Sequence, residues 1–259
     1  MKPTYIVGDV HGCLRELQTL LSLIFQKIGA NPGTIVFVGD LIDKGPDSLG
    51  CLRQVKDLQK YPMGIEVVFV IGNHEDKLIR WLQHEQKIDL GLAVTNPIKA
   101  LPEWDAAMRT WGLKQGGLRW LRSCPMSWSS GNGKYHVVHA GIEPKRKAIP
   151  VCPWLEAKGK DKTVFFTRYV NPEKGKMVAL GQEVFPRDKW WGELYDGRFG
   201  TVIYGHQPFD EVRRDAHAVG IDTSCVYGGC LTAYDPTTGE TLEVKAFDVY
   251  SERMKDYPS

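Results

Sequence analysis

Acidic, amide and imidazole side chains recur in this chain directly after short apolar runs. The five cases are Asp9 and His11 after Tyr5-Ile6-Val7-Gly8, Asp40 after Val36-Phe37-Val38-Gly39, Asn73 and His74 after Val70-Ile71-Gly72, His139 after Val137-Val138, and His206 after Val202-Ile203-Tyr204-Gly205. Four of the seven histidines of the chain occupy these positions. Carboxylate oxygen and imidazole nitrogen together suit first-row transition-metal ions, whereas an all-oxygen set suits magnesium or calcium. The pattern therefore predicts a site for divalent transition metals.

The predicted ligands divide into two sets that share one carboxylate. We assign Asp9 and His11 to one ion, Asn73, His139 and His206 to the other, and Asp40 to both as the bridge. Two ionised carboxylates facing two dications leave about two positive charges, which attract a phosphate dianion. Two such ions, roughly 3.5 to 4 Å apart, also lower the pKa of a water between them, so that it attacks phosphorus directly. The expected chemistry is phosphate ester or anhydride hydrolysis without a covalent protein nucleophile.

His74 is the candidate proton donor of this reaction. It follows the predicted ligand Asn73 on the other side of the turn, where it is placed to protonate the leaving oxygen. Asp43 is the candidate to hold the His74 ring in the required tautomer. Because Asp43 precedes Lys44-Gly45-Pro46, an ordinary turn residue is the alternative interpretation.

Strands and helices are predicted to alternate around these residues. Apolar residues at three- and four-residue steps predict helices over 14–28, through 49–58 and through 78–82, and apolar runs predict strands at 5–8, 34–38, 66–71, 135–138, 201–204, 218–221, 231–234 and 242–247. This alternation is typical of an α/β fold, called α+β in some schemes. The carboxyl ends of parallel strands meet at one edge of a sheet, so the five polar strand ends are expected to form one site.

Two segments depart from this alternation within what we expect to be a single domain of residues 1–259. A helical cap is predicted at 88–130 from tryptophans at helical spacing between Pro and Gly breaks, namely Trp104, Trp111, Trp120 and Trp128. These tryptophans fit either a base-stacking surface or a hydrophobic core. Segment 143–176 holds nine basic and four acidic residues, which fits either a rim that attracts polyanions or a solvated loop.

The composition excludes several classes of protein. The chain has 259 residues, 42% hydrophobic and 25% charged, so it is not disordered, and its formal net charge is only +2. No apolar run approaches the roughly 18 residues of a membrane span, so no membrane association is expected. The amino terminus lacks the features of a secretion leader, and the six cysteines are scattered without a CxxC pair. Reduced thiols and a cytoplasmic location are therefore expected, while the sequence does not indicate an oligomeric state.

Taken together, the motifs resemble those of the calcineurin-like metallophosphoesterases, and within them the phosphoprotein-phosphatase branch. The matching stretches are Gly8-Asp9-Val10-His11-Gly12, Gly39-Asp40-Leu41-Ile42-Asp43-Lys44-Gly45-Pro46, Gly72-Asn73-His74-Glu75, His139-Ala140-Gly141 and Gly205-His206, in the family's order. The resemblance implies a β-sandwich flanked by helices, with a dinuclear centre between the sheets. We expect two divalent transition-metal ions, manganese in the first place and iron, nickel or zinc as alternatives.

Three groups within this branch are similar to the chain. Symmetrical diadenosine tetraphosphatases share the turn at 139–142, and bacterial and phage protein phosphatases share the order of the motifs. The phosphatase domain of bacterial polynucleotide kinase-phosphatases is similar around 72–80 and 204–234. The stretch 221–229 resembles the late strand and turn of the bacterial members.

The resemblance also implies that Lys44, Asn73 and Arg168 bind the substrate phosphate. Lys44 stands where protein phosphatases usually carry an arginine, so the charge is kept but the bidentate fork is lost. Ile71 and Ala140 also depart from the protein-phosphatase pattern, which disfavours that activity without touching the predicted ligands. For Arg168, packing of its stem among aromatic residues is the alternative interpretation.

The expected function is two-metal hydrolysis of a nucleotide-type substrate, either a dinucleoside polyphosphate or the phosphorylated end of a nucleic acid. A serine/threonine protein phosphatase is the alternative, so the expected partners are a phosphorylated small molecule, a nucleotide or a nucleic-acid end, with a phosphoprotein as a further option. A non-catalytic scaffold is disfavoured because the full ligand set and His74 are present. The absence of GxGxxG and GxxxxGK[ST] motifs disfavours a nucleotide-dependent oxidoreductase or kinase.

Overall fold

The first of three sheets contains the amino-terminal strands. The computed structural model describes residues 2–60, 64–179, 182 and 185–253. Its first sheet has the order β13-β12-β1-β2-β3, made of β1 (Thr4–Val7), β2 (Gly33–Phe37), β3 (Ile65–Phe69), β12 (Cys230–Tyr234) and β13 (Thr241–Lys245). β1, β2 and β3 run parallel, whereas β12 joins β1 antiparallel and β13 joins β12 antiparallel. The carboxyl ends of the three parallel strands therefore lie at one edge.

A second sheet contributes three more parallel strands. Its order is β10-β11-β9-β5-β4, made of β4 (Ser127–Ser129), β5 (Tyr135–Val138), β9 (Thr201–Tyr204), β10 (Arg213–Arg214) and β11 (Ala218–Gly220). β5, β9 and β11 are parallel to one another. A third, small sheet has the order β7-β6-β8, with β6 (Tyr169–Asn171), β7 (Lys176–Met177) and β8 (Lys189–Trp190). Short helical turns complete this half: η1 (Trp154–Glu156), η2 (Gly159–Phe165), α6 (Trp191–Leu194) and η3 (Cys225–Tyr227).

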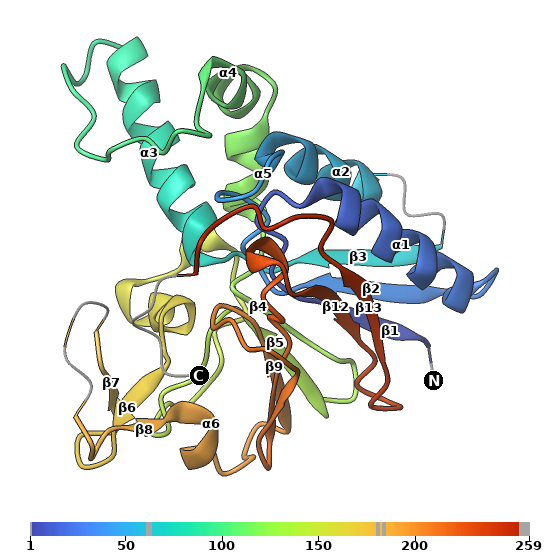
Figure 1. The fold of residues 1–259 in the computed structure, drawn as a ribbon. Coiled ribbons are helices and arrows are strands. Elements are labelled where there is room, and N and C mark those ends of the chain that lie inside the picture. Colours follow the sequence, from blue (N-terminus) through green and yellow to red (C-terminus); the bar gives the residue numbers. More distant parts are fainter. Residues whose placement is uncertain (1, 61–63, 180–181, 183–184, 254–259) are drawn as a thin grey trace.

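Two helices cover the outer face of the first sheet (Figure 1), α1 (Leu14–Ile28) and α2 (Ser48–Lys60). The predicted apolar stripe of α1 is buried, and Gly29 ends the helix at a φ of 60°, a conformation that costs glycine little. A third helix, α3 (Asn73–Asp89), begins where the loop after β3 ends and projects away from the sheets (Figure 1). The predicted α/β fold is confirmed.

The two large sheets pack face to face on an apolar layer. Alternate residues of their strands fill it, because successive side chains of a strand point to opposite faces; they are Ile6, Val36, Val38, Val70, Val137, Ile203, Val219, Ile221 and Tyr234. Burying each of these side chains stabilises the fold by about 1.5–3 kcal/mol. The intervening residues, such as Val7 and Phe37, point to the other face of the first sheet. There they pack with the apolar stripe of α1 in a separate apolar cluster. This sandwich is the architecture that the resemblance implied.

The predicted cap region contains two short helices, α4 (Ala106–Lys114) and α5 (Gly117–Ser123). Its last residues are not helical, because 127–129 form β4 and pair with β5. Trp104 and Trp111 are only 4% and 2% exposed, so these two tryptophans are core residues and offer no face to a base. Trp120 is half-buried and stacks on Phe69 at 5.5 Å.

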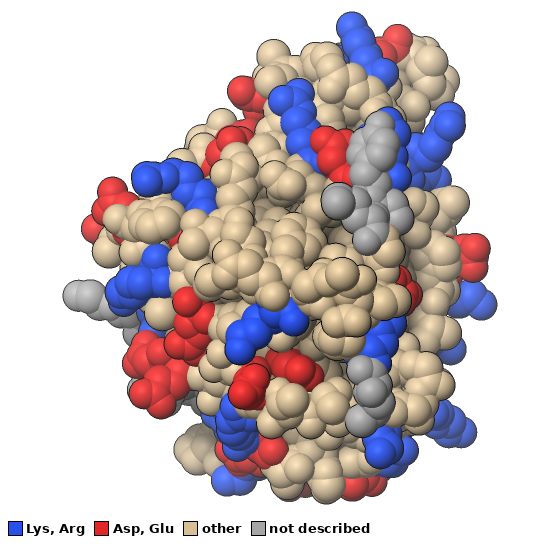
Figure 2. Space-filling model, turned by 90° about the vertical axis from the view of Figure 1, so that its right-hand side faces the viewer, with Lys and Arg blue, Asp and Glu red and all other residues tan. Residues whose placement is uncertain are grey.

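Ion pairs, one within the segment and one to α3, partly neutralise the basic segment 143–176. Arg146 pairs with Asp161 at 3.2 Å, and Lys162 pairs with Asp76 at 2.7 Å. On the face drawn in Figure 2, Lys and Arg side chains lie among Asp and Glu side chains, around a broad area of other residues. Among the helices in the described part of the chain, none is long and apolar enough to span a bilayer.

Candidate metal centre

The loops after five parallel strands meet at one edge of the sandwich. They are the loops after β1, β2, β3, β5 and β9, and they carry Asp9 and His11, Asp40, Asn73 and His74, His139, and His206 respectively. The predicted convergence is therefore observed, and it draws on strands of both large sheets.

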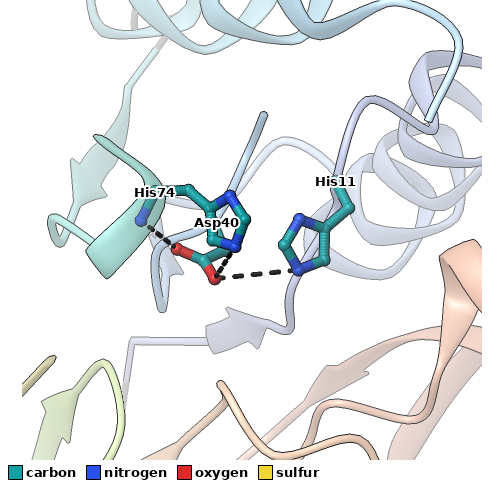
Figure 3. A group of neighbouring side chains, drawn as sticks. All are labelled: His11, Asp40 and His74. Atoms are coloured by element: carbon teal, nitrogen blue, oxygen red, sulfur yellow. Dashed lines mark hydrogen bonds and ion pairs between the residues drawn. The ribbon is translucent and has the colours of Figure 1, made fainter. Parts of the chain in front are cut away.

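Asp40 lies at the centre of this group. Its Oδ2 atom is 3.7 Å from Nε2 of His11 and 3.8 Å from Nε2 of His74, as Figure 3 shows. The same oxygen is 3.4 Å from Nε2 of His139. Its other oxygen accepts the backbone N–H of His74 at 3.1 Å. One carboxylate thus faces three imidazoles, as a bridging ligand would.

Potential ligand atoms fall into two groups that share Asp40. Among the described residues, His11, Asp40 and His74 form one group and Asp40, His139 and His206 the other, with the ligand atoms of each within 4.8 Å of one another. Asn73 belongs beside the second group, since its Oδ1 is 2.9 Å from Nε2 of His139. Asp9 lies next to His206, whose backbone N–H donates to Asp9 Oδ2 at 2.9 Å.

Hydrogen bonds fix which ring nitrogens face the site. Nδ1 of His11 donates to the carbonyl of Ile42 at 2.8 Å, and Nδ1 of His139 donates to the carbonyl of Val38 at 3.0 Å. Nε2 of each ring therefore carries a lone pair that points into the site, the arrangement usual for metal-binding histidines. Nδ1 of His206 lies 3.2 Å from Nε2 of His139 and so faces the same site. Asp9 Oδ1 is buried and has no hydrogen-bond partner. Converging acceptors, one of them an orphaned carboxylate oxygen, fit divalent cations.

Burial and neighbouring charges set the protonation of the site. Burial lowers the pKa of His11 and of His206 well below the usual range, so both rings are neutral at pH 7 and able to bind a metal. Burial also raises the pKa of Asp9, and the nearby Asp222 and Asp40 raise it further. Asp40 behaves oppositely: burial opposes its ionisation, but the surrounding histidines hold the pKa of its carboxyl well below normal.

The backbone is strained at the same positions. Six non-glycine residues in the described part of the chain have positive φ, and five are predicted site residues: His11, Asp40, Asp43, Lys44 and His206. Such conformations cost of order 1–3 kcal/mol each and persist where the surrounding structure enforces them. Small residues permit the crowding, because a Cβ atom on Gly205 would lie 1.8 Å from Asp9 Oδ1. The strain thus coincides with the predicted ligands.

His74 and Asp43, predicted to act together as the acid pair of proton donor and orienting carboxylate, are in contact. Nδ1 of His74 lies 2.6 Å from Asp43 Oδ2, which leaves Nε2 facing Asp40 and the site. Burial lowers the pKa of His74, but Asp40 and Asp43 more than offset this and raise it above the ordinary value. Of the predicted phosphate ligands, Lys44 Nζ lies 3.0 Å from Nε2 of His11, and Arg168 Nη2 lies 3.5 Å from the carbonyl of His206.

Three further residues contact or border the site, although the sequence assigned them no role there. Glu75 is fully buried and accepts backbone N–H groups from Gly72, Asp40 and Leu41. Asp222 is buried just after β11, so it is a sixth polar residue at the end of a parallel strand. Trp104 donates its indole N–H to Asp43 Oδ1 at 2.7 Å. Asp222 could have been predicted, because it follows an apolar strand like the other site residues. The contact of Trp104 with Asp43 could not, because no sequence pattern near either residue indicates it.

A β-sandwich with oxygen and imidazole donors at its carboxyl edge defines a metal-dependent hydrolase of phosphoric esters or anhydrides. The chain belongs to the calcineurin-like phosphoesterase family, whose model matches residues 2–245. The family uses divalent metal ions, in agreement with the donor groups described above.

Relatives match the chain over almost its whole length. A protein of Oceanobacillus iheyensis named bis(5′-nucleosyl)-tetraphosphatase [asymmetrical] is 32% identical over 97% of this chain and 96% of its own. A protein of the same name from Bacillus subtilis is 30% identical over 95% and 96%. The crystal structure of a candidate diadenosine tetraphosphatase superposes with a TM-score of 0.66 at 26% identity, covering 95% of both chains. A cold-active protein-tyrosine phosphatase of a Shewanella species, 18% identical with a TM-score of 0.56 over 95% of this chain and 81% of its own, shares the fold.

Proposed function

We propose that this chain hydrolyses dinucleoside polyphosphates, with a diadenosine tetraphosphate as the representative substrate. The observation that carries the proposal is the end-to-end match to relatives named bis(5′-nucleosyl)-tetraphosphatase. The departures of Lys44, Ile71 and Ala140 from the protein-phosphatase pattern support the same choice. The names of the relatives specify asymmetrical enzymes, so we expect unequal products, ATP and AMP, rather than two molecules of ADP.

The site residues would hold two divalent ions. Asp9 and His11 would bind one ion, Asn73, His139 and His206 the other, and Asp40 both, with manganese as the first choice. When bound, such a pair activates water and neutralises charge on the phosphoryl oxygens. Neutral His11 and His206, and an ionised Asp40, are in the protonation states that this role requires.

The remaining side chains act on the substrate. His74 donates the proton on Nε2 to the leaving oxygen, and Asp43 keeps the other ring proton on Nδ1 through the 2.6 Å contact. Lys44, Asn73 and Arg168 bind oxygens of the phosphoryl group, Lys44 as a point charge and Arg168 as a fork. A phosphate leaving group needs little protonation, because its pKa is about 6. His74 therefore matters most for substrates with poorer leaving groups.

We also propose a cytoplasmic, single-domain enzyme spanning residues 1–259 with its cap at 88–130. All six cysteines are free, four of them buried, which suits a reducing compartment. The cap helices α4 and α5 pack on α3 and share one apolar cluster with the helices over the first sheet.

A substrate panel tests the proposal. Protein loaded with Mn, Ni, Zn or Mg is given diadenosine tetraphosphate, a 3′-phosphorylated oligonucleotide and a phosphoserine peptide, and products are separated by anion exchange. The tetraphosphate should be hydrolysed fastest, with equal amounts of ATP and AMP, and Asp40→Asn should abolish turnover. Faster hydrolysis of the peptide or the oligonucleotide would replace the proposed substrate, and undiminished turnover in Asp40→Asn would refute the assigned site.

A further inference from the structure

The carboxylate of Asp43 is held at both oxygens. Oδ2 accepts from Nδ1 of His74 at 2.6 Å, and Oδ1 accepts from the indole N–H of Trp104 at 2.7 Å. Asp43 and Trp104 are 1% and 4% exposed, so water does not compete for either bond. Two donors, one at each oxygen, fix the orientation of the carboxylate, and the carboxylate in turn orients the His74 ring.

The turn that carries Asp43 depends on further contacts. Asp43 and Lys44 are consecutive non-glycine residues with φ of 72° and 71°, a strained pair. The N–H of Asp43 donates to Ser48 Oγ at 2.8 Å, and the N–H of Lys44 donates to Glu103 Oε1 at 3.2 Å. Glu103 and Trp104 are neighbours in the segment between α3 and α4, so this segment contacts both the backbone and the side chain of the turn.

Trp104 is itself held rigidly. Its ring packs against Trp81 of α3 at 5.5 Å, and Lys77 Nζ lies over it at 5.4 Å. The segment before it is tied to the same helix, because Asn96 donates to the carbonyl of Trp81 and to Glu85. The indole N–H is therefore a preorganised donor rather than a mobile one.

We propose that Trp104 is a positioning residue of the acid pair: its indole N–H orients Asp43, which orients His74. The cap segment is then part of the catalytic apparatus, although Trp104 touches neither substrate nor metal. The inference rests on the proposed role of His74 as proton donor. It predicts that loss of the indole N–H harms proton donation in particular, and not catalysis in general.

Turnover of substrates with different leaving groups separates a loss of proton donation from a general loss of catalysis. Trp104→Phe removes the donor and keeps an aromatic ring. The matched control is Trp154→Phe, because the Trp154 indole donates at the same 2.7 Å to another buried carboxylate, that of Asp76 in α3. On phenyl phosphate, whose leaving group has a pKa of about 10, Trp104→Phe should lower kcat roughly tenfold. Loss of a residue that orients a functional side chain usually lowers activity by about 10- to 100-fold, and this value is at the lower end. On p-nitrophenyl phosphate, whose leaving group is more acidic, the loss should be under about threefold. Trp154→Phe should affect both substrates equally.

A spectroscopic measurement does not require activity or a Trp104 variant. In ¹H–¹⁵N spectra of the metal-free protein, His74→Asn should shift the indole signal of Trp104 and leave that of Trp154 in place, because only Trp104 shares a carboxylate with His74. An unmoved Trp104 signal, or equal losses on both substrates in Trp104→Phe, would overturn the inference.

His74→Asn distinguishes this failure from failure of the proposed mechanism. If His74→Asn loses more activity on phenyl phosphate than on p-nitrophenyl phosphate and Trp104→Phe does not, only the role of Trp104 is refuted. If His74→Asn itself loses equally on both, His74 is not the proton donor, and the inference is overturned together with that role.

Discussion

Lys44 departs from the protein-phosphatase pattern in keeping the charge of an arginine without its bidentate fork. Its Nζ lies 3.0 Å from Nε2 of His11 and 5.2 Å from the ring centre of Tyr227. Burial lowers the pKa of Lys44, but Tyr227, Asp40 and Asp222 together raise it above the ordinary value. The ammonium group therefore stays charged at the mouth of the predicted metal centre, where it can bind a phosphate oxygen.

Removing this charge should weaken phosphate binding. A hydrogen bond to a charged group contributes about 1.5–3 kcal/mol, so Lys44→Met should raise the inhibition constant of inorganic phosphate by roughly 10- to 100-fold. Lys56→Met is the control, because Lys56 also lies over an aromatic ring, that of Trp111 at 5.6 Å, but its Nζ donates to the carbonyl of Gln115 in the cap instead of contacting a predicted ligand. Equal inhibition constants for the two variants would show that Lys44 does not bind phosphate.

At the residue scale, the sequence predicted side chains whose placement follows from strand ends. Asp9, Asp40 and His206 each come directly after an apolar run, so the topology alone brings them together. Trp104 was predicted only as a member of the cap, because its partner Asp43 is 61 residues away and neither side of the contact has a periodic pattern. Its burial at 4% shows that the choice between core and base-stacking surface needed the three-dimensional contacts.

At the scale of elements, the start of α3 joins two strand ends. Glu75 caps the helix by accepting the Gly72 N–H at 3.0 Å. The same carboxylate accepts the N–H groups of Asp40 at 2.9 Å and Leu41 at 2.8 Å. The helix that carries Asn73 and His74 is thereby fixed to the loop that carries Asp40. The predicted ligands Asn73 and Asp40 are therefore held in place relative to each other.

Glu75→Gln should loosen this connection. An amide presents an NH₂ group to one of the three backbone donors, leaving a buried N–H unsatisfied at a cost of about 1–3 kcal/mol. Urea unfolding should show that loss of stability, and titration with Mn should show weaker binding. Glu85→Gln is the control on the same helix, since the half-buried Glu85 bonds to the side chains of Arg109 at 2.8 Å and Asn96 at 2.9 Å, and it should cost under about 1 kcal/mol. A stability loss in Glu75→Gln no larger than in Glu85→Gln would contradict this account.

The elements that the sequence missed are short. β6, β7, β8 and β10 have two or three residues each, too few to show an alternating pattern. α1, α2 and the predicted strands were located to within about two residues, because α1 has a clear apolar stripe and β5 and β9 are flanked by polar turns. Of α3 only the middle, 78–82, was predicted, whereas the helix spans Asn73–Asp89. Which strands share a sheet was not readable locally, since β1 pairs with β12, whose residues come more than two hundred positions later.

At the scale of the whole molecule, the predicted metal centre connects the two large sheets. Asp9 follows β1 of the first sheet and bonds to the backbone of His206 after β9 of the second, 197 residues away in the chain. His139 of the second sheet likewise contacts Asn73, which follows β3 of the first. Unfolding separates these donors completely, so metal binding and folding must be linked.

Removing the metal should therefore lower the melting temperature. An ion present at 100 times its dissociation constant stabilises the native state by about 2.7 kcal/mol. For a chain of this size each kcal/mol shifts the melting temperature by roughly 2–4 °C, so chelation of one ion should lower it by about 5–10 °C. In Asp40→Asn, which lacks the proposed bridging carboxylate, the drop on chelation should be much smaller, because less metal is bound beforehand. The check is differential scanning calorimetry of both proteins with Mn and with chelator, and equal drops would mean that the stabilising ions bind away from Asp40.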